Sequence, residues 1–318
     1  MQGNQRVAAI IPAKDESVRI GATIRAARAI PHVDLVIVVD DGSEDDTQKV
    51  ARAAGATVIR HSVNRGKASA METGAGVVAM RDADGVPPRL LLFLDADLQD
   101  SALECAPLVS PVVNGEVDCT IAYLPPQEGA GGHGFVTGLG RKAIKRLTGW
   151  LPQQPLSGQR CLTRAAYEAV QPFASGWGVE VGMTIDLLVA GFTVQEIPCK
   201  LAHRASRNDL AGTLHRANQY KDVWRAAMSR QISRQGVPIE MRSNAEASPA
   251  SHITRTVRMC GRNTAKNQSL LRCATALRHL STMETVVITL RLQNLAAANP
   301  IMCRKRAQNP AGARKPVR

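Results

Sequence analysis

The stretch Leu35-Val36-Ile37-Val38-Val39-Asp40-Asp41-Gly42-Ser43 decides the fold that we expect for this chain. Five consecutive apolar residues, four of them β-branched, are typical of a strand that is buried on both faces of a sheet. The glycine permits a sharp exit from this strand, and acidic residues surround it. In parallel sheets ligands bind beyond the carboxyl ends of the strands, so we expect functional side chains here.

Short apolar segments of the same kind lie on both sides of this strand. Helical patterns separate them, with Ser17 as the expected N-cap of the first helix and Asp45 or Asp46 at the start of the second. Apolar strands that alternate with helices predict a mostly parallel sheet with helices on both faces, an α/β fold. The further strands predicted in this half are 7–11, 56–60 and 90–94.

A third helical pattern runs from Gly66 to Met80 and contains Gly74-Ala75-Gly76-Val77-Val78-Ala79. The order of its residues matches the glycine fingerprint of dinucleotide-binding proteins. That fingerprint has to follow a strand, whereas here it lies inside a helix. We therefore interpret these glycines as positions of close helix packing.

The second half of the chain continues with strands and helices. A Gly-rich loop is predicted over Gly129–Gly140, and a helix within Gly176–Gly191 places Val179, Met183 and Leu187 on one stripe. The other elements predicted here are strands over 117–122, 156–162 and 193–198 and a closing amphipathic helix over 210–230.

Charge divides the chain into two parts. The 318 residues carry a net charge of +13, but residues 1–231 hold 25 Lys and Arg against 24 Asp and Glu, and residues 232–318 hold 15 against 3. All ten aromatic residues lie between Phe93 and Trp224. A like-charged segment without aromatic residues has little apolar area to offset the entropy of ordering. We expect one folded domain over 1–231 and a basic, poorly ordered extension over 232–318.

The cysteines and the apolar runs indicate the compartment. The chain has seven cysteines, an odd number, and they form no C-x-x-C pair. This pattern favours reduced thiols over disulfides or a zinc site. No apolar run approaches the ~18 residues of a membrane span, and no secretory signal opens the chain. We therefore expect a cytoplasmic protein.

Two carboxylates follow the strand predicted over 90–94. Asp95 and Asp97 are two residues apart, so in extended backbone both lie on one face and can approach one cation. Oxygen ligands suit Mg²⁺ or Mn²⁺ bridging a diphosphate. The alternative interpretation is a solvated turn at the end of a strand.

Two other segments have both a structural and a functional interpretation. Asp40–Thr47 contains five carboxylates in eight residues, more than the cap of a helix requires, and these carboxylates suit hydrogen bonds to a base or a ribose. Asn64-Arg65-Gly66-Lys67 opens a helix, where a lysine can help to hold an anion. It is not a Walker A loop, because His61 stands where that motif needs its first glycine.

Taken together, these motifs resemble the donor half of GT-A glycosyltransferases of the family 2 type, and the resemblance covers most of residues 7–230. The second half is similar to the acceptor half of glucosyl-3-phosphoglycerate synthases. This subgroup binds UDP-glucose and a divalent metal, and it transfers the sugar with retention. The motifs that carry the resemblance are Pro12-Ala13-Lys14-Asp15-Glu16, Asp40–Thr47, Gly66-Lys67, Asp95-Ala96-Asp97, Pro155–Gln159, Gly176–Gly182 and His203-Arg204.

The resemblance implies a role for each matched position. Asp97 and His203 would hold Mg²⁺ or Mn²⁺, and Glu180 would orient the donor sugar or shield positive charge at its anomeric carbon. Thr137 and Arg204 would contact the acceptor. The residues implied for the sugar nucleotide are Pro12, Ala13 and Glu16 at the uridine, Asp41 in the base and ribose pocket, and Lys67 and Asp95 near the ribose.

Two positions depart from the subgroup on the acceptor side. Phe135 stands where the subgroup has an arginine, and Ala205 stands where it has an asparagine. A phosphorylated carboxylate needs charge-assisted hydrogen bonds, and two donors are missing. The candidate replacements are Arg141, Lys142, Arg160, Arg204 and Arg207.

Three functions are compatible with these sequence features. The first is metal-dependent transfer of a hexose from a nucleotide sugar to a small phosphorylated acid such as 3-phosphoglycerate. The second is transfer to a polyprenyl phosphate at a membrane surface, with the basic extension on anionic lipid. The third is a non-catalytic protein that binds nucleic acid or a membrane through the basic extension. Nucleic acid is disfavoured because the carboxylates would repel its phosphates. A homodimer and a peripheral contact with the inner face of the membrane complete the expected partners.

Overall fold

The structure is a computed structural model that describes residues 5–123, 134–201, 210–233 and 253–254. All of these residues belong to the first of two compact units, residues 1–259. The second unit, residues 260–318, lies outside the described residues. The predicted division at 231–232 and the predicted state of the basic extension therefore stay predictions.

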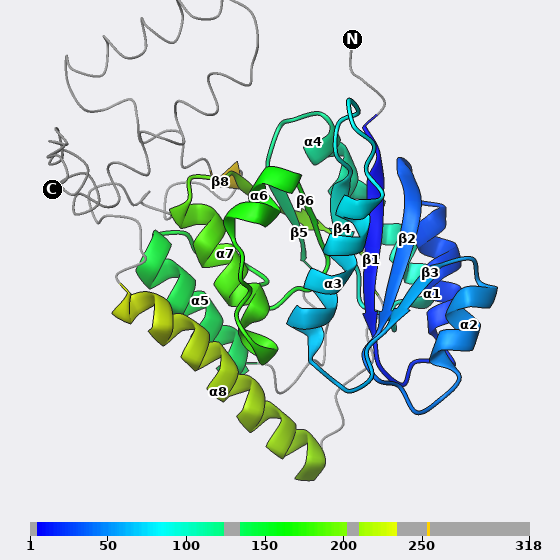
Figure 1. The fold of residues 1–318 in the computed structure, drawn as a ribbon. Coiled ribbons are helices and arrows are strands. Elements are labelled where there is room, and N and C mark those ends of the chain that lie inside the picture. Colours follow the sequence, from blue (N-terminus) through cyan, green and yellow to red (C-terminus); the bar gives the residue numbers. More distant parts are fainter. Residues whose placement is uncertain (1–4, 124–133, 202–209, 234–252, 255–318) are drawn as a thin grey trace, which may run out of the picture. The chain divides into compact units, whose positions relative to one another are not determined.

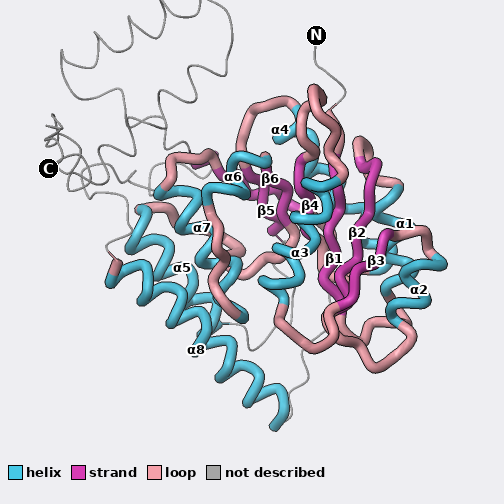
Figure 2. The backbone as a smooth tube through the Cα atoms, viewed as in Figure 1, coloured by secondary structure: helices cyan, strands magenta, loops and turns pink. Residues whose placement is uncertain are grey.

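The described strands form one sheet in the order β3-β2-β1-β4-β6-β5-β7-β8 (Figures 1 and 2). Strands β3, β2, β1 and β4 pair in parallel, and β5 pairs in parallel with β7. Between these two groups, β6 runs antiparallel to both neighbours. The predicted mostly parallel sheet is confirmed. The strands are β1 Val7–Ala13, β2 Val33–Asp40, β3 Thr57–Arg60, β4 Leu90–Phe93, β5 Cys119–Tyr123, β6 Arg160–Leu162, β7 Val194–Pro198 and β8 Ile253–Thr254.

Helices cover both faces of the sheet. Along β1, Ala8 and Ile10 join a core cluster with α3, α5, α6 and α7, whereas Val7, Ala9 and Ile11 join a cluster with α1, η1 and α4. This division follows from the two-residue repeat of a strand, which sends successive side chains to opposite faces. The helices are α1 Ile20–Arg28, α2 Thr47–Ala53, α3 Lys67–Met80, η1 Gln99–Leu108, α4 Val109–Val113, α5 Gly134–Thr148, α6 Arg164–Ala169, η2 Gly176–Gly178, α7 Val179–Val189 and α8 Leu210–Ile232.

Helix α3 packs closely on the sheet through Gly74. A Cβ atom at this position would lie 2.5 Å from Cγ2 of Ile10 on β1, so only a glycine fits without a shift. The interpretation as a packing contact is confirmed for Gly74 and wrong for Gly76, which is exposed and has open space around it. The first residue of α3, Lys67, lies beside Asp95, which follows the end of β4.

Some local expectations were wrong. Residues 134–140 are helical rather than part of a Gly-rich loop, because Val136, Leu139 and Leu147 of α5 pack against the core at helical spacing. The strand expected over 156–162 begins only at Arg160. Ser17 does not cap α1; its backbone N–H donates to Asp45 Oδ2 at 3.0 Å. The sequence also gave no sign of η1, α4 or α6.

The expected reduced thiols are confirmed for the cysteines that the structure describes. Cys105, Cys119, Cys161 and Cys199 are free and buried. Burial raises the pKa of the Cys119 thiol to about 12, so this thiol stays protonated at neutral pH. None of the helices in the described ranges is long and apolar enough to cross a membrane.

Candidate active site

The candidate site lies at the edge of the sheet where β1, β2 and β4 end. These three strands are parallel, so Ala13, Asp40 and the Asp95–Asp97 segment beyond β4 reach the same edge. Strand β6 runs the opposite way, so the residues before it, Ser157–Gln159, arrive at this edge as well. The topology thus joins the donor-half motifs to a segment some 60 residues further along.

Lys67 binds two carboxylates from different parts of the chain. Its Nζ donates to Asp95 Oδ1 at 2.7 Å and lies 3.0 Å from Glu180 Oε1. Burial lowers the pKa of Lys67, but Asp95 and Glu180 raise it by more, so its pKa lies above the ordinary value and the ammonium stays charged. Three residues implied by the resemblance are therefore in direct contact.

Glu180 occupies the first turn of α7 and is almost completely buried, with 5% of its surface exposed. A carboxylate in this position is favoured by the partial positive charge at the helix N-terminus. The ion pair with Lys67 offsets part of the cost of its burial. Glu180 is therefore held rigidly, with its carboxylate directed to the ligand edge of the sheet.

The turn before β6 contributes contacts that the sequence did not reveal. Gln159 Nε2 donates to Asp95 Oδ2 at 2.5 Å, and Ser157 Oγ donates to Gln159 Oε1 at 3.2 Å. A Cβ atom at Gly158 would lie 2.5 Å from Lys67 Nζ and 2.9 Å from Asp95 Oδ1. This turn therefore lies directly against the Lys67–Asp95 pair, and the motif Ser157-Gly158-Gln159 was its only signal in the sequence.

Asp41 organises the loop that leads into α3. It accepts the backbone N–H groups of Arg65 at 2.8 Å and Gly66 at 2.7 Å, and its Oδ1 lies 2.7 Å from His61 Nδ1. Burial raises the pKa of Asp41, but these hydrogen bonds lower it by more, so its pKa lies below the ordinary value. The His61 ring also lies 3.0 Å from Thr73 Oγ1, and no pattern in the sequence indicates either contact of this histidine.

The loop after β1 is pinned to the loop after β2. The backbone N–H of Asp15 donates to Ser43 Oγ at 2.9 Å, and that of Glu16 donates to Thr47 Oγ1 at 2.8 Å. The Glu16 side chain pairs with Arg19 at 2.8 Å. Pro12 and Ala13 end β1 beside this loop, half buried and buried respectively. The residues expected to contact uridine therefore lie in a loop that is hydrogen-bonded to the loop after Asp41.

Asp97 has the surroundings of an available ligand. Its side chain is half buried, and no hydrogen bond or ion pair engages its oxygens among the residues that the structure describes. A free carboxylate at the ligand edge fits a hard divalent cation. The described ranges contain no cluster of three His, Cys, Asp or Glu that could form a complete metal site. His203, the second expected ligand, and Arg204 lie outside the described residues.

The acceptor side is described only in part. Thr137 is half buried on the first turns of α5, where Phe135 is 88% exposed and brings no charge. Arg141 donates to the backbone oxygen of Gln153 at 3.1 Å. Arg160 is fully buried, so the expectation that it replaces a missing acceptor contact is wrong. Its guanidinium instead binds residues of the protein interior.

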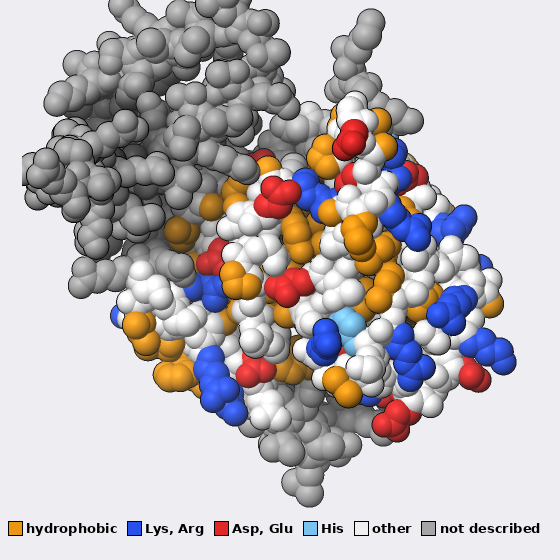
Figure 3. Space-filling view, in the orientation of Figure 1, with side chains coloured by type: hydrophobic (Ala, Val, Ile, Leu, Met, Phe, Trp, Pro, Cys, Tyr) orange, Lys and Arg blue, Asp and Glu red, His pale blue; other side chains and the backbone are white. Residues whose placement is uncertain are grey.

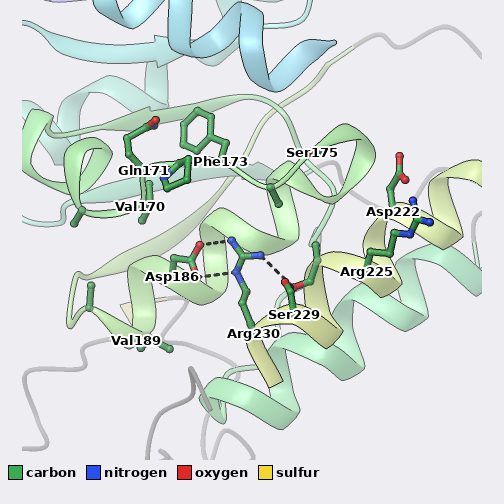
Figure 4. Close-up of a pocket in the computed structure, with 15 residues that line it drawn as sticks. Val170, Gln171, Phe173, Ser175, Asp186, Val189, Asp222, Arg225, Ser229 and Arg230 are labelled. Carbon is green, nitrogen blue, oxygen red and sulfur yellow. Dashed lines mark hydrogen bonds and ion pairs between the residues drawn. The ribbon is translucent and has the colours of Figure 1, made fainter. Parts of the chain in front are cut away.

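A pocket of about 690 Å³ lies elsewhere, between the loop after α6 and the helices α7 and α8. Figure 4 shows Arg230 of α8 reaching across to Asp186 of α7, with Nε 2.7 Å from Oδ1. Arg230 also donates to the Ala226 oxygen, so this guanidinium is already engaged by the protein. None of the lining residues belongs to the Lys67 site. We therefore assign the chemistry to the sheet edge.

The surface in Figure 3 carries interspersed positive and negative side chains. On the face shown, Lys and Arg do not gather into a patch that excludes Asp and Glu over the described part of the chain. This agrees with the near balance of charge over residues 1–231. It gives no support to a nucleic-acid interface on this face.

Comparison with known proteins places the site in a family context. Residues 8–157 match the model of Glycosyl transferase family 2. Glucosyl-3-phosphoglycerate synthase of Mycolicibacterium paratuberculosis is 32% identical over 201 residues, 58% of this chain and 60% of that protein. Glycosyltransferase AglJ of Haloferax volcanii is 25% identical over 181 residues, 55% of this chain and 56% of that protein. The chain thus spans about 60% of the length of the curated relatives that it matches.

The chain also resembles solved structures of glycosyltransferases. A glucosyl-3-phosphoglycerate synthase of Mycobacterium tuberculosis, in complex with Mn²⁺, uridine diphosphate and glucosyl-3-phosphoglycerate, is 28% identical to this chain with a TM-score of 0.56. The match covers 74% of this chain and 82% of that one. The GT-A fold expected from the sequence is confirmed by this likeness.

Proposed function

We propose that this protein is a metal-dependent hexosyltransferase, because residues 8–157 match the model of Glycosyl transferase family 2. The donor would be UDP-glucose, and the acceptor would be a small phosphorylated acid such as 3-phosphoglycerate. The named relatives support this donor and acceptor, since glucosyl-3-phosphoglycerate synthases are among both the curated proteins and the solved complexes that resemble the chain.

The observation that carries the proposal is the contact of Lys67 with both Asp95 and Glu180. The resemblance assigns Asp95 to the donor ribose and Glu180 to the transferred sugar. A donor that lies across the strand ends would meet both carboxylates. The ammonium between them reduces the repulsion between the buried Glu180 and the partly exposed Asp95. The protein therefore has a preorganised place for the polar centre of a nucleotide sugar.

The donor pocket also needs to hold a diphosphate. Asp97 and His203 are the residues that we propose for the divalent cation, Mg²⁺ or Mn²⁺. Such a cation, when bound, supplies several kcal/mol of stabilisation to the charge on a leaving diphosphate. Lys67 alone would be too little, because one ammonium near a phosphate contributes about 4 kcal/mol in a partly screened site, whereas enzymes lower reaction barriers by ~8–23 kcal/mol. Pro12, Ala13, Glu16 and Asp41 would enclose the uridine.

Glu180 is the residue that we propose to act at the sugar. Its carboxylate is rigid, buried and paired with Lys67, so it can accept a hydrogen bond from a sugar hydroxyl or shield positive charge at the anomeric carbon. With retention of configuration, no general base is required on the far face of the sugar. Thr137 and Arg204 are the proposed contacts of the acceptor.

A polyprenyl phosphate is the second candidate acceptor. The specific observation in its favour is Phe135, an apolar side chain that is 88% exposed where the subgroup has an arginine. An apolar surface suits a lipid acceptor better than it suits a phosphorylated acid. A homodimer and a membrane contact through the basic extension remain predictions.

The test combines binding and turnover. Purified full-length protein would be titrated with UDP in the presence and absence of Mn²⁺, and then incubated with UDP-glucose and either 3-phosphoglycerate or a polyprenyl phosphate in detergent. Metal-dependent UDP binding with glucose transfer to 3-phosphoglycerate would support the proposal. Transfer only to the lipid would establish the second candidate. Full activity in excess chelator would refute the metal-dependent mechanism.

A further inference from the structure

Arg160 is buried and forms no ion pair in the described part of the chain, although Glu180 and Glu196 are near enough for their charges to act on its guanidinium. Its side chain has no exposed surface, and no Asp or Glu among the described residues forms an ion pair with it. It donates through Nε to the backbone oxygen of Ser157 at 2.9 Å and through Nη1 to Thr184 Oγ1 at 2.9 Å. Its Nη2 is buried and has no hydrogen-bond partner in the described part of the chain. A guanidinium with an unpaired N–H group is costly to bury, so we expect Arg160 to contribute little to the stability of the fold.

The partners of Arg160 lead in two directions to the candidate site. On one side, Ser157 Oγ bonds Gln159, and Gln159 bonds Asp95. On the other side, Thr184 Oγ1 donates to the backbone oxygen of Glu180 at 2.8 Å. Because Lys67 joins Asp95 to Glu180, the two paths meet. The contacts close a ring through Arg160, Ser157, Gln159, Asp95, Lys67, Glu180 and Thr184.

The position of Arg160 in the sheet explains why it can support both paths. It lies at the start of β6, opposite Phe93 of β4 and Ile121 of β5, so its backbone is fixed by strands on both sides. From this rigid position the guanidinium spans from the Ser157 turn to the second turn of α7. One planar group therefore sets the distance between the segment that bears Gln159 and the helix that bears Glu180.

We propose that Arg160 is a positioning residue for sugar transfer: it holds Gln159 against Asp95 and Glu180 against Lys67 from inside the protein. The inference rests on the proposed function, because it needs Asp95 and Glu180 to face the donor. It assigns no contact with substrate to Arg160. It also gives a role to a buried arginine that the acceptor site does not use.

The decisive variant is Arg160→Met, which keeps an unbranched side chain about as long as the stem of arginine and removes the guanidinium with its donors. Exchange of a buried charge for an apolar group is often neutral or stabilising, so we expect thermal unfolding at or above the wild-type temperature. We expect kcat/KM for UDP-glucose to fall at least tenfold and the affinity for UDP with Mn²⁺, measured by calorimetry, to fall at least threefold. Arg164→Met is the matched control, because Arg164 pairs with Asp82 outside the ring. That variant should lose stability and keep its kinetic constants.

Thr184→Val separates the two paths and covers the case in which Arg160→Met fails to fold. It removes the hydroxyl between Arg160 and the Glu180 backbone at nearly constant volume. We expect kcat to fall at least fivefold while UDP affinity stays within twofold, because the path to Asp95 is intact. A purely structural role would instead lower stability and leave the kinetic constants of the folded protein unchanged.

The outcomes are distinct. A folded Arg160→Met protein with wild-type kcat, KM and UDP affinity, or a Thr184→Val protein with wild-type kcat, would overturn this inference alone. A wild-type protein that neither binds UDP nor transfers sugar would refute the proposed function, and the inference with it. Loss of kcat/KM without loss of stability in Arg160→Met, together with the selective kcat loss in Thr184→Val, would establish the positioning role.

Discussion

Lys67 Nζ lies 3.0 Å from Glu180 Oε1, an ion pair that joins the first residue of α3 to the first turn of α7. The two residues are more than 100 positions apart in the sequence. Both helices begin at the ligand edge of the sheet, so both present their positive ends to the same space. The pair therefore links the half of the site that resembles a donor pocket to the half that resembles an acceptor pocket.

Replacement of Asp97 by alanine should abolish metal-dependent activity and leave the fold intact. Its carboxylate has no hydrogen-bond partner in the described ranges, so little stability is lost. Loss of several kcal/mol of metal stabilisation corresponds to a decrease of about two to three orders of magnitude in kcat. Turnover at several Mn²⁺ concentrations and the melting temperature check this. Asp100→Ala, at an exposed position nearby, is the control, and full activity of Asp97→Ala would contradict the metal assignment.

Gly158→Ala should weaken donor binding. The added Cβ would lie 2.5 Å from Lys67 Nζ, and the flexible end of the lysine would move away rather than the backbone. Loss of a charged hydrogen bond costs ~1.5–3 kcal/mol, so UDP affinity should fall roughly ten- to hundredfold. Gly76→Ala on the same helix as Lys67 has open space around its Cβ and serves as the control. Equal UDP affinities in the two variants would show that the Lys67 contact does not matter for the donor.

The stability contributed by Asp41 should depend on pH on the acid side. Its pKa is lowered in the folded protein, so its ionised form stabilises the fold above its ordinary value of 3.8. This contribution is lost as the pH falls from 3.8 through the lower value in the folded state. The difference in unfolding free energy between wild type and Asp41→Asn should therefore be largest near pH 7 and shrink below pH 3.8. Urea titrations across this range measure it, with Asp46→Asn, at an exposed position, as the control variant.

Removal of residues 236–318 should leave a protein that unfolds cooperatively and transfers sugar to a soluble acceptor. The segment contains none of the ten aromatic residues, and the helices α5, α7 and α8 pack together without it. The deletion removes β8, but this strand adds only two residues to the edge of the sheet. Aggregation, or a broad thermal transition, would instead show that the extension belongs to the core.

Phe135→Arg should improve the use of 3-phosphoglycerate. The side chain is exposed, so an arginine can be accommodated, and it restores a guanidinium that the subgroup has at this position. One charged hydrogen bond is equivalent to a decrease in KM of about tenfold or more. Phe135→Ala is the control for loss of the ring and should leave KM unchanged. A wild-type KM already in the micromolar range, with no gain from arginine, would mean that other cations bind the acceptor.

The donor half of the fold was predictable because its signals are local. Each of the apolar segments around 7–11, 35–39 and 90–94 has the length of a strand, and each is followed by a turn with polar residues. Apolar periodicity and strand-end carboxylates depend on neighbours in the sequence, so they can be read without the fold. The same holds for the helix that begins beside Lys67.

The rest depends on contacts between distant segments. Nothing near Arg160 in the sequence shows that it is buried, since arginines are usually exposed. Likewise, the partners of Gln159 and the His61–Asp41 contact depend on how the strands are ordered. Residues 134–140 were misjudged because glycines predict loops, whereas packing of Val136 and Leu139 on the core favours a helix here.

The reversed direction of β6 has a consequence for how this fold can vary in evolution. Because β6 runs against β4 and β5, the segment before it faces the ligand edge and the segment after it, which leads into α6, faces the opposite edge. An insertion after Leu162 would lengthen a loop far from Lys67 and Asp95. An insertion between Thr148 and Arg160 would displace Gln159 from Asp95. Lineages that keep this chemistry should therefore accumulate length differences behind β6 and keep the length of the segment in front of it.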